Sequence, residues 1–198
     1  MINFLNDSKE LPFVKLKNYF NSAKESNQSF IDAMAVSSYS TSSGEVDSRF
    51  VNLKIVDDQD LIFFSNYSSE KAAQFITHTQ ISILIFWSAI NIQIRMKGHI
   101  KKTSKNFNDN YFKNRSEKKN ALAISSAQSK VIDSYDAVRK NYENAYRNAD
   151  LKKCPDYWGG YKFKPYYFEF WEGHESRINK REIFYYSDDI WKNSFLQP

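Results

Sequence analysis

The order of β-prone and helical segments along the chain is the feature that most constrains its fold. Short runs of β-branched and aromatic residues begin at Ala33 and return after residue 158, but between 103 and 150 they give way to helical spacing. Neither β-rich part alone has enough strands to close a barrel. The sequence therefore predicts an α+β fold in which C-terminal strands complete a sheet that the first half of the chain begins.

The spacing of apolar residues predicts the individual elements. We expect helices at 13–26, after the pair Ser68-Ser69, and at 104–112, 119–126 and 131–149. We expect strands in the β-prone runs 33–40, 49–56, 61–66, 81–87, 91–102, 161–173, 177–187 and 190–197, with turns near 88–91 and at Asp188-Asp189. These elements predict a single domain, 1–198, with an N-terminal helical arm at 1–32, a helical insertion at 103–150 and C-terminal strands at 158–198 that complete the barrel.

Composition narrows the class of protein. The chain has 28 Lys and Arg against 23 Asp and Glu, a net charge of +5, and its clear basic cluster, Lys97 to Lys105, is expected to be a solvated strand end, so we expect no nucleic-acid partner. The single cysteine, Cys154, excludes an intramolecular disulfide framework. The longest apolar run, Ile81 to Ile90, is too short to span a bilayer as a helix. We therefore expect a cytoplasmic protein without a membrane partner.

Several chemistries lack their sequence signals. The three histidines, His78, His99 and His174, are far apart and have no cysteine or histidine companions, so we expect no metal site. No G-x-S-x-G, P-loop or G-x-G-x-x-G motif occurs. Nucleophilic catalysis and dinucleotide binding of the Rossmann type therefore have no support.

Cationic residues interrupt strands that are otherwise apolar. Residues two apart on a strand share a face, so Gln93 lies beside Arg95. By the same rule Arg177, Asn179 and Arg181 share a face. Such rows line a polyanion-binding cleft or form the solvent face of a half-buried sheet, and spacing alone leaves both interpretations open.

A series of motifs in register resembles the pyridoxine/pyridoxamine 5′-phosphate oxidase family. The motifs are RFVNLK (49–54), FFSN followed by SSEK (63–71), IQIRMKG (92–98), YFKNR (111–115), AQS (127–129), WGGY (158–161) and EFWEG with SRINKR (169–181). The likeness runs from about Ala33 to Pro198. It implies an FMN-binding split β-barrel with flanking helices, which forms a homodimer and holds FMN at the subunit interface.

The resemblance also implies the residues of a site. The cofactor-binding positions would be Arg49, Phe50, Val51, Asn52, Leu53, Lys54, Phe64, Ser65, Lys71, Gln93, Gln128, Ser129, Trp171 and Arg181. The substrate-binding positions would be Lys54, Tyr111, Arg115, Lys119, Arg177 and Asn179, of which Arg177 and Asn179 would be catalytic. Arg49 and Lys71 suit a flavin phosphate, because cations supply charge-assisted hydrogen bonds.

By the same likeness the protein would be an FMN-dependent oxidase of pyridoxamine or pyridoxine 5′-phosphate. In this family a hydride passes from the C4′ carbon of the phosphorylated pyridine to flavin N5, and oxygen then regenerates the flavin and leaves as hydrogen peroxide. The product is pyridoxal 5′-phosphate.

The chain departs from the family pattern at several positions. Glu70 stands where the family has an arginine, Lys119 where it has a serine, and Asn179 where it has a histidine. The N-terminal arm is short and has no obvious match to the arginine and tyrosine of relatives. Two alternatives follow: an FMN-dependent oxidase of this fold that acts on another small substrate, as relatives in phenazine biosynthesis do, or a flavin- or pyridoxal-phosphate-binding protein without catalysis.

Overall fold

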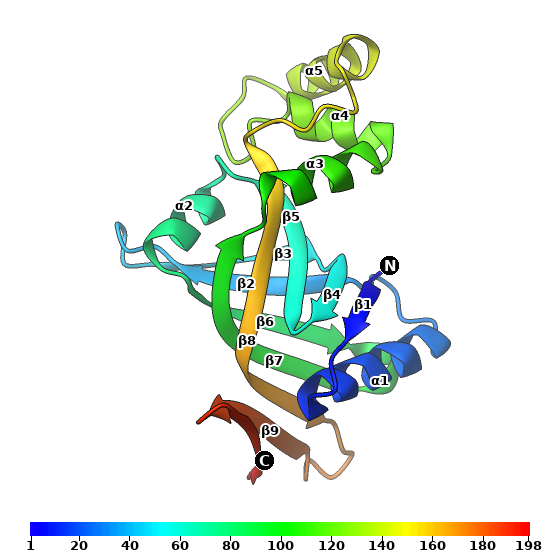
Figure 1. Ribbon diagram of the computed structural model, residues 1–198, viewed down its shortest axis with the longest axis vertical. Helices are drawn as coiled ribbons and strands as arrows, with labels where there is room; N and C mark the ends of the chain where they lie inside the picture. The colour runs from blue at the N-terminus through cyan, green and yellow to red at the C-terminus, as the bar shows by residue number, and fades with distance from the viewer.

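A computed structural model describes residues 1–198 as a coiled sheet with helices around it (Figure 1). The strands follow the order β1-β4-β5-β8-β7-β6-β2-β3, and β9 and β10 extend the sheet from β8. In chain order the elements are β1 (Asn3–Asp7), α1 (Leu11–Glu25), β2 (Ala33–Tyr39), β3 (Val46–Asn52), β4 (Ile55–Asp58), β5 (Asp60–Asn66), α2 (Glu70–Thr77), β6 (Gln80–Trp87), η1 (Ser88–Ile90), β7 (Ile92–Lys102), α3 (Lys105–Lys113), α4 (Glu117–Ser125), α5 (Tyr135–Asn148), β8 (Trp158–Glu172), β9 (Lys180–Ser187) and β10 (Ile190–Leu196).

The long strand β8 joins the two β-rich parts of the chain. Its residues 161–172 pair antiparallel with the whole length of β7, while residues 158–163 pair with β5 and residues 167–172 with β9. In Figure 1 it runs along the length of the molecule. The expected α+β split barrel is confirmed, and the C-terminal strands complete its sheet as expected.

The core lies on one face of this sheet. Along β6 and β7 every second residue is buried: Ile83, Ile94 and Met96 are fully buried, whereas Arg95 and Lys97 face outward. This alternation is the period that strand geometry imposes on a sheet with one covered face.

Helix α1 covers the core face. Its apolar residues Phe13, Leu16 and Phe20 are buried, and the ring of Phe13 contacts that of Phe168 edge-to-face at a centroid distance of 5.1 Å. Pro12 lies in the first turn, where a missing backbone N–H costs nothing. The expected helix at 13–26 is therefore present, but it begins two residues earlier and ends one residue earlier than expected.

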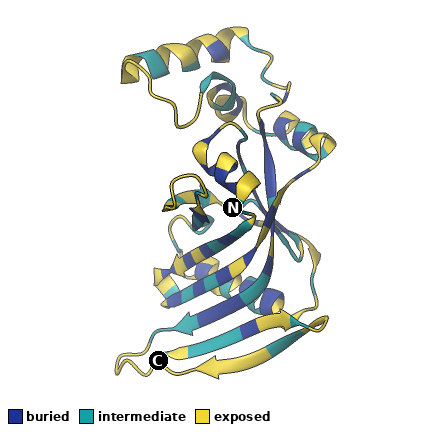
Figure 2. Ribbon diagram, turned by 90° about the vertical axis from the view of Figure 1, so that its left-hand side faces the viewer, coloured by how far each residue is buried: buried dark blue, intermediate teal, exposed yellow.

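The 103–150 segment forms α3, α4 and α5 at one end of the barrel (Figure 1). Ser104 and Ser134 cap α3 and α5, and each side-chain oxygen accepts a backbone N–H three residues later. The cap at Ser134 explains why α5 begins at Tyr135 and not at Val131 as expected. Ala145 is the buried residue of α5, and most of that helix is exposed (Figure 2).

Two expectations about the first half of the chain were wrong. The run 49–56 is two strands, because the N–H of Leu53 donates to Asp32 O and that of Lys54 to Ile62 O, which moves the chain from one ladder to the next. The arm at 1–32 is not wholly helical: β1 precedes α1 and pairs parallel with β4. Sequence spacing missed β1 because only five residues form it.

Both expected turns are present. Ser88–Ile90 is a short 3₁₀ turn that ends at Asn91 in the left-handed region. Asp188 and Asp189 both have positive φ, 54° and 60°, as a two-residue hairpin turn of type I′ requires. None of the helices is long and apolar enough to cross a membrane.

The register shift between Lys97 and Gly98 gives a first prediction. A Cβ on Gly98 would collide with Lys164 O and lie 2.7 Å from both the Phe163 ring and Pro165 Cα, and this backbone cannot move without breaking the β7–β8 ladder. We expect Gly98→Ala to lower the free energy of unfolding in urea by about 1–3 kcal/mol or more. Lys97→Ala, at the exposed neighbouring position, is the control, and an equal effect in both variants would contradict the steric explanation.

Candidate functional site

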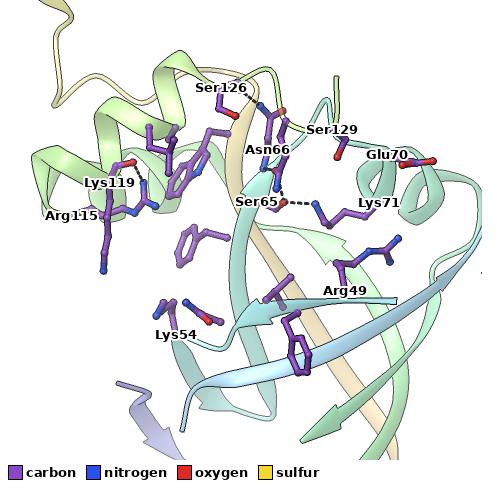
Figure 3. A pocket seen from close by; sticks show the side chains of 18 of the residues that line it. Arg49, Lys54, Ser65, Asn66, Glu70, Lys71, Arg115, Lys119, Ser126 and Ser129 are labelled. Atoms are coloured by element: carbon purple, nitrogen blue, oxygen red, sulfur yellow. Dashed lines mark hydrogen bonds between the residues drawn. The ribbon is translucent and has the colours of Figure 1, made fainter. Parts of the chain in front are cut away.

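A cavity of about 660 Å³ lies between β3 and β5 and is closed by residues of α2, α3 and α4 (Figure 3). Strand β3 ends the sheet and has β2 as its ladder partner, so its other side is free to border a cavity. The cavity is within the size range of small-molecule sites. It contains most of the cofactor and substrate positions that the resemblance implies.

One end of the cavity holds two cations close together. Lys71 is 6% exposed, and its Nζ donates to Ser65 Oγ and Ser69 Oγ, both at 3.3 Å, but to no carboxylate. Burial and the charge of Arg49 lower the pKa of Lys71. A buried ammonium without a carboxylate is costly, so this end suits an anion that completes its hydrogen bonds.

Arg49 reaches the same end from β3. Its guanidinium donates to Ser38 Oγ at 2.5 Å and to Gln74 Oε1 at 3.2 Å, and Asp47 lies 3.7 Å away. Burial lowers the pKa of Arg49, while the charges of Asp47 and Glu70 oppose this effect. Both carboxylates also border the cavity, so the two cations at this end are partly balanced.

The segment after α4 is tied to β5 at this end. Gln128 Oε1 accepts hydrogen bonds from the Asn66 N–H and the Ser65 hydroxyl, each at 3.3 Å, and Asn66 Nδ2 donates to Ser126 O. Ser129, with a φ of 69°, lies beside them on the cavity wall. These contacts place two expected cofactor positions, Gln128 and Ser129, next to Ser65.

The other end of the cavity has an aromatic wall. Phe64 stacks on Tyr111 at a centroid distance of 3.7 Å and on Trp158 at 5.1 Å. The Arg115 guanidinium lies 5.0 Å from the Trp158 ring and donates to Lys119 O and Asn120 Oδ1. Burial is the main cause of a raised pKa at Tyr111 and a lowered one at Arg115.

Sequence reasoning missed Trp158 as a site residue. It is 5% exposed, opens β8 opposite Asn66, and lines the cavity. The signal was present, because Trp158 belongs to the WGGY motif beside two glycines. Lys54, an expected substrate position, lies at the edge of the cavity with its Nζ on Asp32 Oδ2.

Three expected cofactor positions do not line the cavity of their own chain. Gln93, Trp171 and Arg181 are in register on β7, β8 and β9, on the face of the sheet that points away from the core. There the buried carboxylate of Glu169 accepts from Arg181 Nε at 2.9 Å and from Arg95 at 3.0 Å. We call this surface the outer sheet face.

Three further expected positions behave differently from their sequence pattern. Leu53 is 1% exposed in the hydrophobic core and does not line the cavity. Arg177 and Asn179 precede β9, so the expectation that they share a strand face with Arg181 was wrong. The reason is a turn: the Arg177 N–H donates to His174 O, Arg177 has a φ of 60°, and Asn179 Oδ1 accepts the His174 N–H.

Comparison with protein families gives matches over most of the chain. Residues 24–148 match the family described as pyridoxamine 5′-phosphate oxidase. Residues 158–198 match the family described as pyridoxine 5′-phosphate oxidase C-terminal dimerisation region.

Individual proteins agree. The chain is 33% identical over 195 residues to a pyridoxine/pyridoxamine 5′-phosphate oxidase of Rhodopirellula baltica, covering 96% of this chain and 87% of that protein. It is also 33% identical over 196 residues to one of Cytophaga hutchinsonii, covering 96% and 90%.

Solved structures share the fold. One is PhzG from Burkholderia lata in complex with tetrahydrophenazine-1-carboxylic acid, with a TM-score of 0.89, 24% identity and coverage of 94% of this chain and 92% of that one. Another is a pyridoxamine 5′-phosphate oxidase-related, FMN binding protein from Nostoc punctiforme, with a TM-score of 0.78, 12% identity and coverage of 96% and 99%.

The unpaired burial of Lys71 gives a second prediction. We expect Lys71→Met to raise the free energy of unfolding in phosphate-free buffer by about 0.5–2 kcal/mol, because it removes a desolvated charge. Inorganic phosphate should then stabilise the wild type and not the variant, measured by urea denaturation with and without phosphate. Lys101→Met, at an exposed lysine, is the control, and a Lys71→Met variant that phosphate stabilises as much as the wild type would contradict the anion site.

Proposed function

The chain belongs to the pyridoxamine 5′-phosphate oxidase family, and from this premise we propose that it is an FMN-dependent oxidase. We propose that it converts pyridoxamine or pyridoxine 5′-phosphate to pyridoxal 5′-phosphate, with oxygen as the acceptor and hydrogen peroxide as a product. The observation that carries the proposal is the buried, carboxylate-free Lys71 beside Arg49, at one end of a cavity whose other end has an aromatic wall.

The residues present fit FMN. Arg49 and Lys71 offer two cations to one terminal phosphate, and Ser65, whose hydroxyl donates to Gln128, accepts a hydrogen bond from Lys71 and holds it beside the cavity. When bound, FMN accepts a hydride from the substrate and passes electrons to oxygen. Glu70 adds a negative charge to the same end, so we expect binding weaker than an arginine there would give.

The other end of the cavity supports a flat, anionic substrate. Phe64, Tyr111 and Trp158 form a wall of parallel rings, and Arg115 is fixed beside it by hydrogen bonds to neutral oxygens. Lys119 lines the same end and takes part in no ion pair. Stacking would hold the pyridine ring, and these cations would hold the phosphate.

We propose that a homodimer completes the site. Gln93, Trp171 and Arg181 lie on the outer sheet face, so only a second copy of the chain can bring such residues to the cavity. Leu84 and Phe86 are 37% and 53% exposed on β6 of that face, as expected of an apolar surface that a partner covers. The C-terminal family match, described as a dimerisation region, supports the same arrangement.

A second candidate function keeps FMN and changes the substrate. Lys119 and Asn179 stand where the family has a serine and a histidine. PhzG, which has a similar fold, was solved in complex with a carboxylic acid. An oxidase of another small anionic substrate is therefore the alternative to the vitamer oxidase. A binding protein without catalysis is the third possibility.

A mixing experiment tests the shared site. We expect Lys71→Ala to weaken FMN binding by about 1.5–3 kcal/mol through the loss of one charge-assisted contact. Arg181→Ala should also weaken it, from the opposite subunit. When the two variants are unfolded and refolded together, each mixed dimer should regain one intact site, which titration of FMN fluorescence would count.

The refolded single variants are the controls for that mixing. A monomer that binds FMN tightly by light scattering, or a mixture without recovered sites, would contradict the shared site. Protein that binds no added FMN would contradict the flavoprotein proposal itself.

Peroxide release tests the substrate. With pyridoxamine 5′-phosphate and FMN saturation checked for each protein, we expect Arg177→Ala to reduce turnover much more than FMN affinity, because a cation over the pyridine ring would hold the oxygen substituent of the ring and so orient the C4′ carbon toward the flavin. Asn179→His should keep or raise the activity. If neither the wild type nor Asn179→His oxidises the vitamer with FMN fully bound, the alternative substrate replaces the first proposal.

A further inference from the structure

Lys54 differs from the other cations at the substrate end of the cavity because it already has a carboxylate partner. Its Nζ lies 2.5 Å from Asp32 Oδ2. Arg115 donates only to the neutral oxygens of Lys119 and Asn120, and Lys119 makes no ion pair. Asp32 has one other cationic partner, the N-terminal ammonium of Met1 at 3.4 Å, which lies outside the cavity. Of the three cations at this end, only Lys54 therefore has a carboxylate partner, and Arg115 and Lys119 have none.

The backbone holds this pair in place. The Leu53 N–H donates to Asp32 O at 2.7 Å, and the Lys54 N–H donates to Ile62 O at 2.9 Å, where the chain passes from β3 to β4. The side chains of Lys54 and Asp32 are only 23% and 17% exposed. Water screens such a pair less than one on the open surface, so an incoming anion has to compete with Asp32 for Lys54.

The charged state of Asp32 persists to low pH. Burial acts to raise its pKa, but the hydrogen bond and charge of Lys54, together with those of the N-terminal ammonium, outweigh burial and hold the pKa below its ordinary value. The carboxylate is therefore ionised at any pH near neutrality. The negative charge of Asp32 also acts on Tyr111 in the cavity wall, where it adds to burial in raising the pKa of the tyrosine hydroxyl.

We propose that Asp32 is a specificity-determining residue, which acts through Lys54 to lower the preference of the substrate end for a doubly charged phosphate over a singly charged carboxylate. The inference rests on the proposed function, because it assigns the substrate to this end of the cavity. Asp32 does not line the cavity, so it is a positioning residue for Lys54 and not a substrate contact.

Coulomb's law gives the direction and relative size of the effect. A freed lysine attracts a dianion with about twice the energy with which it attracts a monoanion at the same place. Releasing Lys54 should therefore tighten phosphate binding by on the order of ten- to a hundredfold, and carboxylate binding by about the square root of that factor. The ratio of the two affinities reports the role of Asp32 directly.

The experiment compares two probes on two matched variants. Dissociation constants for pyridoxamine 5′-phosphate and pyridine-3-carboxylate are measured by calorimetry with FMN present, at mildly alkaline pH, where phosphate is a dianion because its second pKa is about 6. Asp32→Asn should tighten both probes, the phosphate more. Asp60→Asn is the control, because Asp60 pairs with Lys162 at 2.9 Å with similar exposure, outside the cavity.

A double variant tests whether Asp32 acts through Lys54. In a Lys54→Met background, Asp32→Asn should leave the ratio of the two affinities unchanged, whereas Asp32→Glu in the wild-type background should retain the wild-type ratio. An unchanged ratio in Asp32→Asn, or a change as large in Asp60→Asn or in the Lys54→Met background, would overturn the proposal.

Failure of this inference can be told from failure of the proposed function. FMN binding and peroxide release are measured on the same wild-type protein, and their absence would count against the proposed oxidase. The probe affinities are read separately, because either probe can occupy the cavity without turnover. If the wild type binds neither probe, Asp32→Asn should create phosphate binding, and its failure to do so would overturn the inference.

Discussion

The pairing of β8 with the whole length of β7 is the constraint on which the rest of the structure depends. Because β8 exchanges β5 for β9 as its other neighbour, one strand contributes to both the barrel and the C-terminal extension. Its first residue, Trp158, forms part of the cavity wall, and Trp171, near its last, lies on the outer sheet face. The two groups of site residues are thus parts of one rigid ladder, which fixes the spacing between them.

Much of the fold could be predicted from the sequence because its signals are local and repeated. The alternation in β6 and β7 follows from one covered face of the sheet, and Asp188-Asp189 has the residues of a tight turn. The break at Leu53 could not be predicted, since it depends on a hydrogen bond to Asp32, a residue twenty-one positions earlier. Strand β1 has no pattern of its own and exists because β4 offers it an edge.

The residues of the cavity could be predicted from the sequence better than the expected site residues that lie outside it. Motifs brought Arg49, Ser65, Lys71 and Gln128 to attention, and the structure brings them together. Spacing did not reveal that Gln93 and Arg181 lie away from the cavity. Strand periodicity predicts which residues share a face of the sheet, but not what lies against that face. The Arg177 turn was also hidden, since a positive φ at a non-glycine residue is set by surrounding contacts and not by residue type.

The contrast between Lys71 and Lys54 shows how the cavity distributes its charge. Both are lysines with little exposure, but one has two hydroxyls as partners and the other a carboxylate. A buried ammonium whose hydrogen-bond partners are only hydroxyls destabilises the folded protein until an anion binds to it. The presence of Lys71 therefore implies that the fold loses some stability in favour of binding. A cation that is paired with a carboxylate of the protein, as Lys54 is, has a smaller desolvation cost and a lower affinity for an anionic ligand. In the proposed role of Asp32, the demand for negative charge falls on Lys71 at one end and on Arg115 and Lys119 at the other, because these are the cations of the cavity that have no carboxylate partner.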